Sequence, residues 1–564
     1  MSFPKPFKQL LQTTAIAILS GLAAAVPARS ADAIFFDYGL FGRSLPVSSL
    51  ETFIENGTVD ADLAPYLELI PADKQQQFRQ DLSTPVTALG ADIPVDVSNP
   101  FVLSQLLYTP IGELVLDRVG ELIQTEGRQN GRQAIRSAII LAAADPEGLS
   151  LINLIRFYPT GGIRLDLQKI LALSKAVNAN IETTNQLVEV ATQQSIAAAA
   201  MEPALDYNAL PNPAELGPFE IEMRSLMLQD EQRDRNLPID LYLPRNLGTV
   251  PGPISVIILS HGYGDTRQNP EASAAARKLA ANGFVVAMPE HIGSNKAYQD
   301  DLTRGLVQES FEAMEFINRP LDIRFLLDTL EQKNATEFQG RLQLDRVGLV
   351  GHSFGGYTAL ASAGATVDID YLQQQCTPRE TIDPDQVNIA LLLECRALEL
   401  MASPDVMRQL TDGSMTDERV GLVMTLAPVS NLFGESGVSK IDIPVVIMGG
   451  ASDIASPLAL EQLTAFRGLT TAEKYLYLGE NLSHTPALTR VALNATNPNS
   501  AIADNLEETE ELFSNLVVSL AIAHNRVYLQ GDESYRPYLT SAYVEAVSVE
   551  PFKLHLLRSV PEGF

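Results

Sequence analysis

The segment Gly351-His352-Ser353-Phe354-Gly355 has the pattern G-x-S-x-G, which can present a serine for nucleophilic attack on an acyl group. It follows a strand-like run at 346–350 and precedes a run of small residues that begins at Tyr357. A turn between strand and helix is so tight here that the residues two positions from the serine must lack bulk. The pattern predicts Ser353 as a nucleophile at a helix N-terminus, where the Phe354 amide can donate to a developing oxyanion.

The base that activates this serine is expected among six histidines. A serine hydroxyl is a weak nucleophile, so it needs a base within hydrogen-bond reach and a third group that holds the base in one tautomer. His484 lies in a loop after the apolar run 474–478, and it fits the chain order serine, acid, histidine. We predict His484 as the base; the alternative is a solvent-facing loop histidine. The other five histidines precede the serine, adjoin it, or lie in the terminal helix and tail, at His261, His291, His352, His524 and His555.

The acid is expected between the serine and the histidine, directly after a strand. Asp453 follows the apolar run 445–448, whereas the loop after Leu426 has no carboxylate before Glu435. We therefore predict Asp453 as the partner of His484. Two alternatives stay open: Asp453 only caps a helix that begins near residue 456, or the acid is Glu435 or Glu480.

A second oxyanion donor is expected in the loop after the first central strand. That loop reads Ser-His-Gly-Tyr-Gly at 260–264. Gly262 and Gly264 allow the backbone to approach a substrate closely, and we predict the Tyr263 amide as the donor that acts with the Phe354 amide. His261 is interpreted as a structural residue that orders this loop.

The elements that must position these residues follow from hydrophobic periodicity. Strand-like runs alternate with helical runs beyond residue 219, which predicts a mostly parallel sheet with helices on both faces. The expected strands are 237–243, 254–260, 284–288, 347–350, 420–426, 445–449 and 474–478, and the expected helices are 271–282, 319–330 and 356–364. Residues 34–200 instead carry helical patterns at 46–55, 71–82, 100–107, 111–123, 131–144 and 167–200.

These patterns predict an α/β domain preceded by an all-α accessory domain. The expected parts are a signal peptide at 1–33, the helical domain at 34–200, a proline-rich linker at 201–218, the catalytic domain at 219–530 with an insertion or lid at 365–418, and a tail at 531–564. The signal peptide rests on Lys5 and Lys8, a short apolar run at 15–26, and the small residues Ala31 and Ala33 before Ile34. We therefore expect an exported protein, periplasmic or secreted, with no integral membrane segment in the mature chain.

The net charge of the chain argues against two classes of partner. The formal net charge is −29 and no run of lysine and arginine occurs, which argues against a nucleic acid or an anionic membrane surface as partner.

The two cysteines, Cys376 and Cys395, both lie in the insertion and are compatible with a disulfide or with two free thiols. No cysteine and histidine cluster indicates structural zinc.

Three segments together resemble a branch of a known superfamily: Ser-His-Gly-Tyr-Gly at 260–264, Asn-Gly-Phe-Val-Val-Ala-Met-Pro-Glu-His at 282–291, and Gly-His-Ser-Phe-Gly-Gly at 351–356. Over roughly 219–530 the chain resembles the platelet-activating-factor acetylhydrolase and dienelactone-hydrolase-like branch of the α/β-hydrolases. The helical region resembles a domain of unknown function that is fused to such hydrolases in exported bacterial proteins. The resemblance implies an ester-cleaving enzyme with a serine, a histidine and an acid, and without metal or other cofactor.

The chain departs from that branch in two places. The acetylhydrolases place their acid after the strand that follows the nucleophile, where this chain has Pro428 and Val429, so Asp453 must take the commoner superfamily position. Dienelactone hydrolases proper use a cysteine nucleophile, whereas position 353 is serine. The resemblance therefore does not carry over a substrate.

The sequence predicts an exported serine carboxyl-ester hydrolase that acts on a small-molecule ester or lipid. One rival is a lipase or polyester depolymerase, for which the insertion would supply a hydrophobic lid. A rival of another class is a non-catalytic hydrolase-fold binding protein. The oligomeric state stays open.

Overall fold

The computed structural model describes residues 30–86, 96–377, 387–486, 488–490 and 506–564. The described residues divide into two compact units, an N-terminal unit that ends at Leu171 and a C-terminal unit that begins at Ala172. The division falls near the start of α9 (Leu167–Met201), the long helix that the sequence predicts at 167–200. Most of the expected signal peptide lies outside the described residues. None of the described helices is both long and apolar enough to cross a membrane.

The N-terminal unit contains a sheet as well as helices, so the all-α expectation for this region is wrong. The sheet has the order β2-β1-β4-β3, built from β1 (Ala33–Tyr38), β2 (Phe41–Pro46), β3 (Ile123–Thr125) and β4 (Gly162–Asp166). Strands of three to six residues are too short for alternation to stand out beside helical patterns. The predicted helices are present as α2 (Val47–Asn56), α4 (Gln75–Ser83), α5 (Pro100–Leu107), α6 (Pro110–Leu122) and α7 (Arg132–Ala144).

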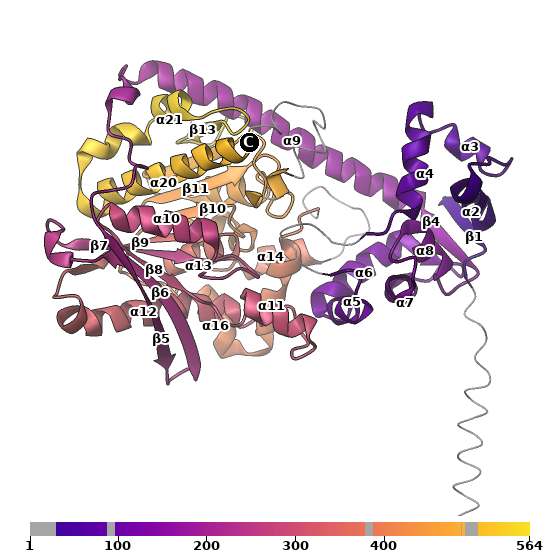
Figure 1. Ribbon diagram of the computed structural model, residues 1–564, viewed down its shortest axis with the longest axis horizontal. Helices are drawn as coiled ribbons and strands as arrows, with labels where there is room; N and C mark the ends of the chain where they lie inside the picture. Colours follow the sequence, from indigo (N-terminus) through magenta and orange to yellow (C-terminus); the bar gives the residue numbers. More distant parts are fainter. Residues whose placement is uncertain (1–29, 87–95, 378–386, 487, 491–505) are drawn as a thin grey trace, which may run out of the picture. The chain divides into compact units, whose positions relative to one another are not determined.

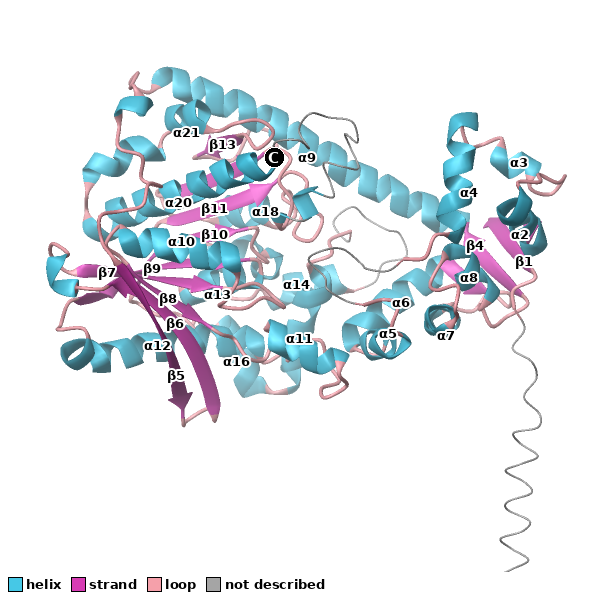
Figure 2. Ribbon diagram, viewed as in Figure 1, coloured by secondary structure: helices cyan, strands magenta, loops and turns pink. Residues whose placement is uncertain are grey.

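The C-terminal unit is built on a nine-stranded sheet with the order β13-β12-β11-β10-β9-β7-β8-β6-β5 (Figure 2). The strands from β12 to β8 in this order are parallel, while β5, β6 and β13 pair antiparallel at the two ends. Their bounds are β5 (Ile221–Asp230), β6 (Arg235–Pro244), β7 (Ile254–Ser260), β8 (Val285–Pro289), β9 (Leu342–His352), β10 (Val420–Leu426), β11 (Val445–Gly450), β12 (Lys474–Gly479) and β13 (Leu554–Leu557).

Helices cover the faces of this sheet (Figure 1). On one face α10 (Pro270–Ala281) contacts α20 (Leu506–Gln530), and on the other α12 (Glu315–Glu337) contacts α13 (Phe354–Ser362). The central strands are therefore buried on both sides, which explains their nearly continuous apolar runs. This arrangement confirms the predicted α/β class with a mostly parallel sheet.

The tail beyond residue 530 is part of the same fold. After α21 (Ser541–Val547), β13 pairs antiparallel with β12 and extends the sheet. The insertion is folded as α14 (Ile369–Cys376), α15 (Leu391–Glu394), the 3-10 helix Cys395–Ala402 and α16 (Pro404–Thr411). A disulfide joins Cys376 to Cys395, which decides between the two alternatives for these cysteines.

Candidate active site

The turn between β9 and α13 holds Ser353 in a strained conformation. Its φ of 55° and ψ of −119° lie where a non-glycine residue is uncommon. A Cβ at Gly351 would collide with the carbonyl of Gly355, and a Cβ at Gly355 would collide with the carbonyl of Ser260. The glycines of the motif are thus required by close approach of backbone, as the pattern predicts.

Parallel register brings the site loops to one edge of the sheet. Ser260 at the end of β7 lies opposite Gly351 of β9, and Gly450 of β11 lies opposite Gly479 of β12. The loops that follow these strands carry Tyr263, Ser353, Asp453 and His484. Segments more than 200 residues apart therefore meet where the carboxyl ends of the strands meet.

The structure brings together three residues in the order that nucleophilic catalysis requires. The His484 Nε2 atom lies 2.9 Å from Ser353 Oγ, and the His484 Nδ1 atom lies 2.9 Å from Asp453 Oδ2. With Nδ1–H donating to the carboxylate, Nε2 is free to accept the serine proton. Asp453 has a fully buried side chain, whereas that of His484 is 13% exposed. This geometry suits a serine nucleophile with a histidine base.

Asp453 does not cap a helix, which was the alternative interpretation, because α18 (Gln462–Gly468) begins well beyond it; Asp453 instead orders the turn that follows β11. Its Oδ1 atom accepts hydrogen bonds from the backbone N–H groups of Ala455 and Ser456, at 2.9 and 2.8 Å, while Oδ2 faces His484. The two oxygens therefore bind different partners, and the N–H groups of the turn hold the carboxylate in place for the imidazole. The competing acids lie elsewhere: Glu435 pairs with Arg467, and Glu480 with His555.

His352, next to Ser353, contacts the loop of His484. Its Nε2–H donates to the His484 carbonyl at 2.9 Å, and the two rings lie 4.9 Å apart. Burial, with His484 nearby, lowers the pKa of His352 to about 4, so the ring is neutral at ordinary pH. The motif indicates packing or hydrogen bonding at this position, but the partner 132 residues away appears only in the folded chain.

The loop after β7 passes beside Ser353. A Cβ built on Gly262 would lie 3.3 Å from Ser353 Cβ, so this loop borders the space in front of the serine. Among the described residues, the backbone N–H groups of Tyr263 and Phe354 have no hydrogen-bond partner within the chain. Both amides are therefore available to a ligand oxygen.

An aromatic cluster lies behind these two amides. The ring of Phe311 makes edge contacts with Tyr263 and Phe354 at centroid distances of 5.8 Å. Arg396, from the insertion, stacks its guanidinium over the same Phe311 ring at 4.9 Å and donates to the Phe311 carbonyl. The insertion thus contacts the aromatic residues that support the site. Within the described parts of the chain, no group of three or more histidine, cysteine or acidic side chains could hold a metal ion.

Comparison with protein families gives two matches. Residues 231–368 match the family described as "Putative esterase", a stretch that runs from the loop before β6 through β9 and the Ser353 turn. Residues 30–166 match the family described as "Alpha/beta hydrolase of unknown function (DUF1400)". The second match covers the N-terminal unit, which contains none of the site residues and has the small four-stranded sheet. A search of the curated proteins finds no match. Together the two matches support the α/β-hydrolase superfamily for this chain, and neither singles out the acetylhydrolase branch.

Proposed function

From the premise that the C-terminal unit has an α/β-hydrolase fold with a match to esterases, we propose that the protein is a serine hydrolase that cleaves carboxylic esters through an acyl-enzyme. The observation that carries the proposal is the position of His484, 2.9 Å from both Ser353 Oγ and Asp453 Oδ2. The Tyr263 and Phe354 amides, which have no partner in the described parts of the chain, add a place beside the serine for the negative charge of a tetrahedral intermediate.

Each half-reaction uses the same groups. Ser353 Oγ attacks the ester carbonyl carbon while its proton passes to His484 Nε2, and the carbonyl oxygen becomes an oxyanion held by the Tyr263 and Phe354 amides. The imidazolium, held by Asp453, then protonates the alcohol as the bond from carbon to alkoxy oxygen breaks. In the second half, His484 takes a proton from water, whose oxygen attacks the acyl carbon, and returns it to Ser353 as the acid leaves.

We propose export to the periplasm or the medium on two grounds. The amino-terminal segment has the charge and apolar pattern of a signal peptide. The disulfide between Cys376 and Cys395 suits an oxidising compartment.

The proposed function is tested by hydrolysis of p-nitrophenyl esters of increasing acyl length, with Ser353→Ala beside the wild type. We expect the variant to lose at least about a thousandfold in kcat, because no other group supplies the nucleophile. Ser362→Ala is the matched control, since it makes the same change in the same helix at a hydroxyl without a partner in the described residues. Activity of Ser353→Ala above about one per cent of the wild type contradicts the assignment.

The contact between the insertion and the aromatic cluster favours a second candidate, a lipase or polyester depolymerase. Arg396 fixes the insertion to Phe311, directly behind Tyr263 and Phe354, so this segment is well placed to shape the acyl site. Increasing rates with acyl length and activation at an interface would support this candidate. A preference for short, dissolved esters would support the small-ester hydrolase, and no serine-dependent hydrolysis at all would favour a binding protein.

A further inference from the structure

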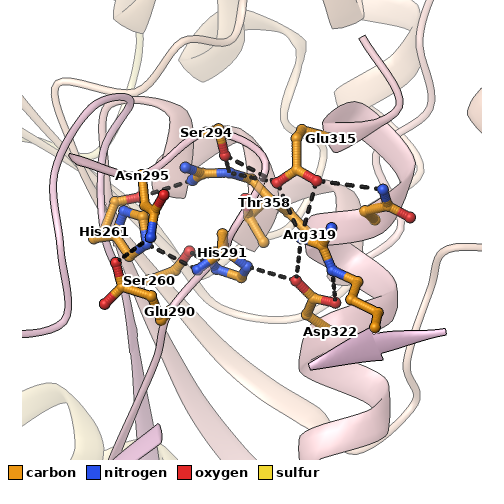
Figure 3. A network of polar contacts seen from close by, with 12 residues as sticks. Ser260, His261, Glu290, His291, Ser294, Asn295, Glu315, Arg319, Asp322 and Thr358 are labelled. Carbon is orange, nitrogen blue, oxygen red and sulfur yellow. Dashed lines mark hydrogen bonds and ion pairs between the residues drawn. The ribbon is translucent and has the colours of Figure 1, made fainter. Parts of the chain in front are cut away.

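A buried polar network holds the loop after β7 (Figure 3). Its centre is Arg319 of α12, whose side chain is fully buried. The guanidinium donates from Nη1 to the His261 carbonyl at 2.7 Å, from Nη2 to the Gly262 carbonyl at 3.2 Å, and from Nε to Ser294 Oγ at 2.9 Å. One side chain thus binds two successive carbonyls of the loop that borders Ser353.

A second donor acts on the same peptide group. The His261 ring accepts a hydrogen bond at Nε2 from the backbone N–H of His291, at 3.0 Å, so its proton resides on Nδ1. That Nδ1–H donates to the Gly262 carbonyl at 2.8 Å. Burial and the nearby Arg319 charge lower the pKa of His261 well below its usual range, which keeps the ring in this neutral form.

The direction of the Gly262 carbonyl sets the direction of the Tyr263 amide. A trans peptide is planar, and its C=O and N–H bonds point to opposite sides. Because Arg319 and His261 draw the Gly262 oxygen into the network, the Tyr263 N–H must point away from it. The Gly264 N–H donates to the Ser294 carbonyl at 2.8 Å, which fixes the far end of the same loop.

Arg319 also contacts the residue that carries the other unpartnered amide. Its guanidinium lies over the Phe354 ring, 4.4 Å from the centroid. Burial lowers the pKa of Arg319 to about 10, so the group stays cationic at neutral pH, and Glu315 one turn earlier on α12 lies 3.9 Å away as its counter-ion. The same cation therefore touches both halves of the oxyanion site from behind.

We propose that Arg319 is a positioning residue for the oxyanion hole: it orients the Gly262–Tyr263 peptide so that the Tyr263 amide faces the oxyanion formed at Ser353. The inference rests on the proposed esterase function. Arg319 touches neither Ser353 nor His484, so it acts through the loop and leaves the proton transfer between these residues unchanged.

The test compares Arg319→Met and Arg319→Lys with Arg235→Met in the full chain. Arg235 is the matched control, because it is buried and pairs with Glu315 and Asp322 in the same network but makes no hydrogen bond to the loop carbonyls. We expect Arg319→Met to lower kcat by about a hundredfold, the loss typical of one oxyanion donor, with KM within about threefold of the wild type. We expect Arg235→Met to lower Tm by a similar amount but kcat by less than about threefold.

Two further readouts separate positioning from a merely structural role. The inhibition constant of a boronic acid, whose adduct with Ser353 is tetrahedral, should weaken in parallel with kcat/KM in the Arg319 variants and stay constant in Arg235→Met. The pH at which kcat/KM falls to half on the acid side should not move, because the base is untouched. If Arg319→Met does not fold, Arg319→Lys provides the test in its place. Lysine keeps a cation near Glu315, but its ammonium lacks the planar set of N–H donors with which the guanidinium binds both carbonyls and Ser294.

Folded Arg319 variants with kcat within about threefold of the wild type, or a kcat loss in Arg235→Met equal to theirs, would overturn the inference while the esterase function stands. A wild type that hydrolyses no ester and does not react with a fluorophosphonate would overturn the proposed function, and the inference with it.

Discussion

Four histidines around Ser353 show how hydrogen-bond partners give one residue type different roles. His484 contacts both Ser353 and Asp453, and its side chain is partly exposed. His352 and His261 instead bind backbone carbonyls and hold loops in place. His291 lies between Ser260 Oγ and Asp322 Oδ2, at 3.0 Å from each, and so repeats the triad pattern. Since the His291 side chain is completely buried, no substrate reaches it, and this second set belongs to the network that supports the loop.

The Asp453→Asn variant tests whether catalysis needs the hydrogen bond between His484 Nδ1 and Asp453 Oδ2. The asparagine oxygen can still accept from Ala455 and Ser456, so the fold of the loop should be kept. The amide in place of Oδ2 cannot accept from His484 Nδ1–H and favours the wrong tautomer. We expect kcat to fall by about a thousandfold or more with little change in Tm. Glu480→Gln is the control. A near-wild-type rate for Asp453→Asn would show that the acid of the site is a residue other than Asp453.

His352→Leu tests the link between the nucleophile turn and the base. Removal of the donor to the His484 carbonyl should loosen the His484 loop and lower kcat by about tenfold, because small displacements of catalytic groups are costly. His352→Gln, which retains an N–H donor, should recover part of the rate. Equal rates for the two variants would show that this hydrogen bond does not position His484.

At the scale of elements, the insertion is attached to the α/β core by buried polar contacts. The Glu394 carboxyl at the end of α15 accepts from the backbone N–H of Leu432, while Glu461 accepts from Ser430, Asn431 and Asn388. Burial and the neighbouring Glu461 raise the pKa of Glu394 well above its usual range. The disulfide partner Cys395 is the next residue, so covalent and polar attachments of the insertion lie together. The insertion is thus held to the core next to the strand ends rather than loosely attached.

Glu394→Gln should make unfolding less dependent on pH. The folded-state pKa of Glu394 lies above the unfolded value of about 4.5, so the folded chain keeps a proton that the unfolded chain releases, and stability falls as pH rises from 4.5 through the folded pKa. Glutamine is neutral at every pH and can accept from Leu432 in the same way. We expect a higher Tm than wild type at pH 8 and a smaller difference at pH 4.5, with the exposed Glu418→Gln as control. A lower Tm for Glu394→Gln at pH 8 would contradict this reading.

At the scale of the whole molecule, contacts within the N-terminal unit favour one cleavage position for the proposed signal peptide over another. Ala31 is 3% exposed and belongs to the hydrophobic core of that unit. The Asp32 N–H donates to the Gly161 carbonyl, and the Asp32 carbonyl accepts from Val47, each at 3.0 Å. Cleavage before Ile34 would remove these contacts, whereas cleavage after Ser30, which has the small residues Ala28 and Ser30 of an A-x-A-like site, would keep them.

Intact mass and N-terminal sequencing of the protein secreted into the periplasm or medium check this point. We expect the exported chain to begin at Ala31. A chain that begins at Ile34 should have a lower Tm for its N-terminal unit, because it loses the buried Ala31 side chain and the two backbone hydrogen bonds of Asp32. Recovery of the full-length chain only from the cytoplasm would contradict the proposal of export.

The sequence by itself determined the parts of this protein that depend on local pattern. The apolar runs at 254–260 and 420–426 coincide with β7 and β10, because strands buried on both faces leave a continuous signal. The G-x-S-x-G motif located the turn at Ser353 because its steric demand falls on adjacent residues. Short strands such as β3 and the edge strand β13 leave no such signal. The sequence therefore predicts only helices in the N-terminal unit and no element in the tail.

Only the tertiary structure decided which distant groups meet. Asp453 binds the backbone of its own turn with one carboxylate oxygen and His484 with the other, and no spacing rule separates one carboxylate oxygen from the other. The sequences around His352 and Arg319 do not indicate their partners, and the hydrogen bonds to the carbonyls of His484, His261 and Gly262 span 132, 58 and 57 residues. Hydrogen bonds are short and directional, so such partners are fixed by where parallel strands end and by how helices pack on the sheet.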